Sequence, residues 1–189
     1  SNAYGADKSG EIIYKEDMVN YAALDDLYVG LVMPALAPQQ HIVHATTQGF
    51  VPAAIALAPG DILQVYNDTH RSQTFFVSQT SESGDGIQSF PDLTAGSSAI
   101  YTIQLSGNLE LLSENEANLK ANLLSRKNML SKRLKSGGSY QFENLNPGQY
   151  PLIFWYWRLG KIEQQIDIKA GENSQINKTL SVDSVMRSP

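Results

Sequence analysis

Apolar and polar residues alternate in short runs along most of the chain, and turn residues separate these runs. Residues 98–105 alternate most cleanly, which predicts a strand with one buried face. Residues 58–61 (Ala-Pro-Gly-Asp) predict a turn, because Pro59 presets its own φ and Gly60 accepts a positive φ. Many short strands separated by Gly/Pro turns predict an all-β protein built from one or two β-sandwiches.

Composition narrows the classes of function. The 189 residues are 42% hydrophobic and 17% charged, which is too apolar for a disordered protein. No apolar run reaches the roughly 18 residues of a membrane helix. The net charge of -5 argues against non-specific nucleic-acid binding, which needs a basic surface. The chain has no cysteine, so disulfides, thiolate-bound metal centres and thiol catalysis are excluded. We therefore expect no nucleic-acid partner and no membrane insertion.

The sequence contains no set of residues that suggests catalysis. It has no G-x-S-x-G elbow and no Gly-rich phosphate loop, so we expect a protein that is not an enzyme. The three histidines are His41, His44 and His70. His41 and His44 are three residues apart on a predicted strand, which places their side chains on opposite faces and disfavours chelation by the pair. His70 falls in a predicted turn, where we expect an exposed side chain.

Several spacings are similar to those of a known family. Phe50-x-Pro52, Pro59-Gly60-Asp61 and Tyr66-Asn67 resemble the first half of plastocyanin-like cupredoxins. More narrowly, they resemble the bacterial exported proteins named methylamine utilization proteins. The closing motif of that family, D-G-x-F … L-P-x-G-x-Y … W-H, is similar to residues 138–140, 145–150 and 155–156. The resemblance implies a cupredoxin-like Greek-key β-sandwich.

The same resemblance places the family's four copper ligands on residues of other types. Counting back without a gap from the closing motif puts Ser113, Glu116 and Leu119 at the ligand Cys, His and Met. Counting from Asn67 puts Gln73 at the first ligand His. A blue-copper centre needs a thiolate and two imidazoles, so the resemblance implies vacated positions with no metal and no cofactor. We expect the four side chains to converge at one end of the sandwich. Glu116 should then reach solvent or accept a hydrogen bond from Gln73 or Ser113, because an unpaired buried carboxylate is costly.

Residues 113–135 fit two different structures. Ser113 and Glu116 have capping-box spacing, the leucines of this stretch follow a helical stripe, and its acidic residues precede its basic ones. The family resemblance instead implies a loop followed by a strand. We favour the loop and strand, with at most one helical turn at residues 113–119, because the match runs without a gap from Ser113 to Tyr140.

We expect two parts in the chain. A cupredoxin-like domain at residues 37–135 would be inserted in a smaller carboxypeptidase-regulatory-like (transthyretin-like) β-sandwich formed by residues 10–36 and 136–183. Two domains in sequence are the alternative. Residues 1–3 look like the remnant of a cleaved tag, which is consistent with prior removal of a signal peptide, so we expect a periplasmic or secreted bacterial protein.

Two functions remain open at this point. The first is a copper-free binding or accessory module whose partner is another exported protein, with no small-molecule ligand assigned. The second is a metal-binding or electron-transfer-related protein with an unorthodox site, in which His70, Glu116 or their neighbours supply nitrogen and oxygen ligands.

Overall fold

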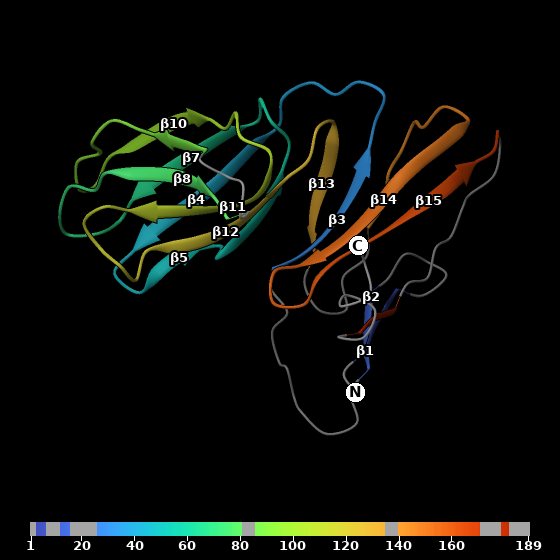
Figure 1. Cartoon of the computed structure of the whole chain (residues 1–189), viewed down its shortest axis with the longest axis horizontal. Helices are drawn as coiled ribbons and strands as arrows, with labels where there is room; N and C mark the ends of the chain where they lie inside the picture. The colour runs from blue at the N-terminus through green and yellow to red at the C-terminus, as the bar shows by residue number, and fades with distance from the viewer. Residues whose placement is uncertain are drawn as a thin grey trace. The chain divides into compact units, whose positions relative to one another are not determined.

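The structure is a computed structural model that describes residues 3–6, 12–15, 26–80, 86–134, 140–170 and 179–181. Within these ranges the chain forms strands and turns and no helix, so the all-β class is confirmed (Figure 1). Accordingly, the described part of the chain holds no helix that is long and apolar enough to cross a membrane. The chain divides into two compact units, one formed by residues 1–32 and 131–189 and the other by residues 33–130.

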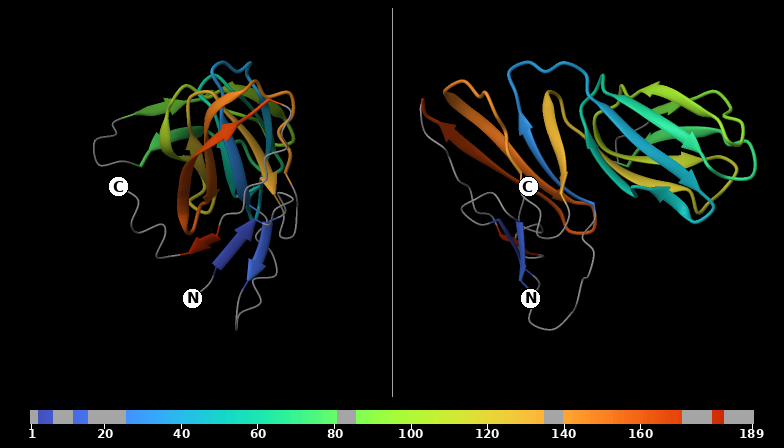
Figure 2. Two further views of the ribbon diagram at one scale, coloured as in Figure 1. Left: turned by 90° about the vertical axis from the view of Figure 1, so that its right-hand side faces the viewer. Right: turned by 180° about the vertical axis from the view of Figure 1, so that it is seen from behind.

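Unit 33–130 contains two sheets. The four-stranded sheet has the order β10 (Ser98–Thr102), β7 (Ile62–Asn67), β4 (Gln40–Thr46) and β5 (Gly49–Val51). The five-stranded sheet has the order β6 (Ala54–Leu57), β12 (Lys120–Ser125), β11 (Gly107–Ser113), β8 (Phe75–Gln79) and β9 (Ile87–Ser89). Strands β4 and β7 pair in parallel, as do β6 and β12, and the other pairs are antiparallel. The chain passes repeatedly between the sheets, as Figure 2 shows from two further directions, so the predicted β-sandwich is confirmed for this unit.

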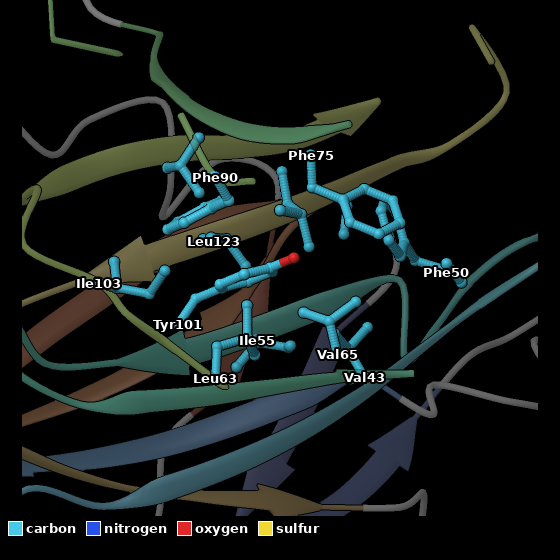
Figure 3. Close-up of a cluster of buried hydrophobic side chains, with 14 of the residues drawn as sticks. Val43, Phe50, Ile55, Leu63, Val65, Phe75, Phe90, Tyr101, Ile103 and Leu123 are labelled. Carbon is cyan, nitrogen blue, oxygen red and sulfur yellow. The ribbon is translucent and has the colours of Figure 1, made fainter. Parts of the chain in front are cut away.

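The core of this unit lies between the two sheets. On the four-stranded sheet, alternate residues such as Val43, Leu63 and Val65 are fully buried, as the period-2 pattern of a strand requires. Tyr101 also points inward, is 5% exposed and stacks on Phe90 with ring centroids 4.0 Å apart. Figure 3 shows its hydroxyl oxygen among apolar side chains, and among the described atoms this hydroxyl has no hydrogen-bond partner. Burial raises the pKa of this hydroxyl above its ordinary value.

The turn before β7 is held by a buried carboxylate. Asp61 N donates to Ala58 O at 2.9 Å and Gly60 has φ of +93°, which confirms the turn predicted at residues 58–61. The Asp61 carboxylate accepts hydrogen bonds from Gln39 N (2.9 Å), Ala58 N (2.9 Å) and His41 Nε2 (2.8 Å). Burial by itself would raise the pKa of Asp61, but these hydrogen bonds outweigh it and lower the pKa below its ordinary value.

The open side of the sandwich, where β9 and β10 are edge strands, is bridged by one side chain. Gln88 on β9 donates from Nε2 to Thr102 O at 2.6 Å, and its Oε1 accepts from Gln104 N at 3.0 Å. Because an amide group has both a donor and an acceptor, it can bond a strand edge as another peptide group would. Gln88 therefore joins the edges of the two sheets.

The other unit contains two sheets of its own. The first has the order β13 (Met129–Leu134), β3 (Leu27–Val32), β14 (Gly148–Tyr156) and β15 (Gly160–Ile168). The second has the order β16 (Thr179–Ser181), β1 (Ala3–Ala6) and β2 (Ile12–Lys15). Across the first sheet, Tyr28 lies beside Trp155 with ring centroids 5.9 Å apart. The carboxypeptidase-regulatory-like assignment of this unit stays a prediction.

The sequence pattern also predicts a strand at residues 139–142, and this prediction is wrong for residues 140–142, which form no strand. The ring of Tyr140 packs edge-on against Phe154, 6.0 Å between centroids, and Phe142 lies under the Lys132 ammonium. Side-chain packing onto the unit therefore replaces strand pairing at this segment. Residue 139 and the turn predicted at residues 136–138 lie outside the described residues.

Candidate functional site

Two loops meet at one end of the sandwich of unit 33–130. Residues 68–74 connect β7 to β8, and residues 114–119 connect β11 to β12. Because β8 and β11 pair antiparallel with Ser113 opposite Phe75, the start of one strand lies beside the end of the other. The two loops are also joined directly, since Glu114 N donates to Thr74 O at 2.9 Å and Thr74 N donates to Asn115 Oδ1 at 2.8 Å.

A buried amide lies where these loops meet. The Gln73 side chain is fully buried, and its backbone pairs with Leu93 through an isolated β-bridge. Its Oε1 accepts a hydrogen bond from Ser113 Oγ at 2.6 Å. Its Nε2 donates to Thr69 Oγ1 and to Glu116 Oε1, each at 3.1 Å. We call Thr69, Gln73, Ser113 and Glu116 the Gln73 cluster.

The cluster reaches the surface through an ion pair. Glu116 Oε1, which accepts from Gln73, also lies 3.0 Å from Arg71 Nε. The Glu116 side chain is 18% exposed and that of Arg71 is 69% exposed. One carboxylate oxygen, Oε1, therefore has both a buried amide and an exposed guanidinium as donors.

The β7–β8 loop is fixed from within by Asn67. Its Oδ1 accepts from Thr69 N (3.1 Å) and Thr69 Oγ1 (2.6 Å), and its Nδ2 donates to Arg71 O (3.0 Å) and Leu93 O (2.8 Å). Asn67 and Thr69 are both buried. An Asn that bonds its own backbone two residues on forms an Asx turn, so the last residue of β7 sets the course of the loop that carries Gln73.

Of the four residues singled out by the sequence, the structure joins Gln73, Ser113 and Glu116 by hydrogen bonds. The expectation that Glu116 accepts a hydrogen bond from Gln73 is confirmed. Leu119 is fully buried in the hydrophobic core, and its N donates to Glu116 O at 3.1 Å in the same turn. That these residues stand at former copper-ligand positions stays a prediction.

The helix considered for residues 113–135 is absent over residues 113–134, the part of that range that the structure describes. Strand β11 ends at Ser113, β12 begins at Lys120 and β13 follows, with turns between them. Residues of β12 pair with β11 on one side and with β6 on the other. Strand β12 buries the adjacent residues Leu123 and Leu124, and Leu124 is not part of the helical stripe. The loop-and-strand interpretation is confirmed.

The donors in and around the cluster are poorly suited to a metal ion. Within the described residues, no three His, Cys, Asp or Glu side chains lie together as a metal site. Both ends of the Gln73 amide are already bonded, and the Arg71 guanidinium faces the Glu116 carboxylate. His70 is exposed in the β7–β8 loop. His41 bonds Asp61, whereas His44 Nδ1 lies 2.6 Å from Asp68 Oδ2 on the opposite face of β4.

The sequence did not single out Thr69 or Arg71. Both lie in a polar run between two apolar strands. In this run Asn67, Thr69, Arg71 and Gln73 occupy every second position, and this spacing is the sequence signal that could have grouped them. Their roles depend on how the loop bends back, which the Asn67 turn determines.

No protein-family model matches the chain, and no curated protein matches it. Solved structures do show similarity. A purple cupredoxin from Nitrosopumilus maritimus is 9% identical, with 47% of this chain and 99% of that one covered and a TM-score of 0.39. An amicyanin mutant is 10% identical, with 51% and 98% covered and a TM-score of 0.38. Auracyanin A from Chloroflexus aurantiacus is 7% identical, with 48% and 100% covered and a TM-score of 0.36. About half of this chain takes part in each of these similarities.

Proposed function

We propose that this chain is a copper-free cupredoxin-like module that acts by binding and not by electron transfer or catalysis. Its resemblance to methylamine utilization proteins supports an exported accessory role, with another exported protein as partner. The observation that supports the proposal most is the Gln73 cluster. Where the resemblance places copper ligands, Ser113, Gln73 and Glu116 satisfy one another through hydrogen bonds.

The chemistry of the cluster explains why copper is not expected there. A blue-copper centre uses a thiolate, two imidazoles and a weak axial ligand, and Gln73, Ser113, Glu116 and Leu119 supply neither the thiolate nor the imidazoles. A cation at Glu116 Oε1 would have to displace Arg71 and break the bond from Gln73. The alternative site built from His70 and Glu116 is disfavoured for a related reason, because Oε1 of Glu116 is already engaged and the Arg71 guanidinium lies 3.0 Å from it.

Titration of the protein with Cu(II) and with Zn(II), with the heat of binding measured by calorimetry, tests this proposal. We expect wild-type protein to bind neither ion tightly and stoichiometrically, and to be purified without copper. One tightly held copper per chain, bound at the Gln73 cluster, would overturn the proposal.

A designed variant provides the matched positive control. Replacing all four residues (Gln73→His, Ser113→Cys, Glu116→His and Leu119→Met) should create a Cu(II) site with an intense copper–thiolate absorption band in the visible range. A folded variant that binds no copper would show that these positions do not form a ligand set, and would remove the account of a vacated site.

A further inference from the structure

We draw no further inference here: the strongest candidate, the outer face of the sheet β10-β7-β4-β5 with the exposed side chains of Ile42, Val51 and Ile100, carries none, because nothing in the structure shows what covers it.

Discussion

Replacing Gln73 by methionine removes the centre of the cluster while keeping a side chain of similar volume. The buried amide makes three side-chain hydrogen bonds, to Ser113, Thr69 and Glu116. Its backbone bonds to Leu93 are unaffected, since methionine keeps both the N–H and the C=O. The substitution therefore isolates the contribution of the amide from that of the chain fold around it.

The expected loss can be worked from these contacts. The two bonds to hydroxyl groups contribute about 1 kcal/mol each, and the bond to the Glu116 carboxylate about 1.5–3 kcal/mol. Part of this is recovered, because Glu116 keeps Arg71 and Thr69 keeps Asn67 as partners. We therefore expect Gln73→Met to lower the free energy of unfolding by about 2–4 kcal/mol.

Urea unfolding followed by circular dichroism measures this loss, and hydrogen exchange of the β8 and β11 amides confirms that it arises in unit 33–130. Gln64→Met is the matched control. The Gln64 side chain bonds only an exposed partner, Gln40, at 2.8 Å, so its loss should cost less than about 0.5 kcal/mol. In a double-mutant cycle, Ser113→Ala should cost less in the Gln73→Met background than in the wild type. A Gln73→Met protein as stable as Gln64→Met, or strict additivity with Ser113→Ala, would refute the reasoning.

Three further predictions follow from single residues. Tyr101→Phe should raise the free energy of unfolding by about 1 kcal/mol, because it removes a buried hydroxyl that has no partner among the described atoms; a loss of stability in urea unfolding would contradict this. Asp61 has a lowered pKa, so the stability it provides is complete above the unfolded value of about 3.9 and is lost as the pH falls through the folded value. Asp61→Asn should abolish this part of the acid dependence, and an unchanged profile of stability against pH would count against the assignment. Gly148 has φ of +152°, which a β-branched residue resists, so Gly148→Val should cost about 1–3 kcal/mol in thermal unfolding. An unchanged Tm would contradict that expectation.

The strands of unit 33–130 could be predicted because their signals are local. The alternation at residues 98–105 and the turn at Gly60 depend only on neighbouring residues. The turn forms where it was expected, and the strand forms over residues 98–102, whereas residues 103–105 are not part of it. The stretch around Leu119 was ambiguous because its leucines fit a helical stripe and a strand equally well. Pairing with the preceding strand β11 and with β6, which is distant in sequence, decided between the two. The strand predicted at residues 139–142 was wrong for residues 140–142 because a contact outside the segment decides its structure. The Tyr140 ring packs on Phe154, and the segment does not pair as a strand.

The candidate site could be predicted only in part. The convergence of Gln73 with Ser113 and Glu116 came from an ungapped comparison with family motifs, because residues 40 positions apart carry no local signal of contact. Arg71 was missed, since its position depends on a loop bent by the buried Asn67 side chain. Side-chain hydrogen bonds of this kind depend on geometry of a few tenths of an ångström, which an amino-acid pattern does not contain.

The amide bridge made by Gln88 has a consequence for how this protein meets other chains. An exposed strand edge is a template on which a further strand, or an aggregating copy, can grow. At the end of β10 that place is already taken by a side chain that mimics a peptide group, bonded to Thr102 O and Gln104 N. Any strand that added there would first have to displace Gln88. Growth along the backbone is thus hindered at this edge, which leaves contact through side chains as the route by which the sheet can bind a neighbour without polymerising.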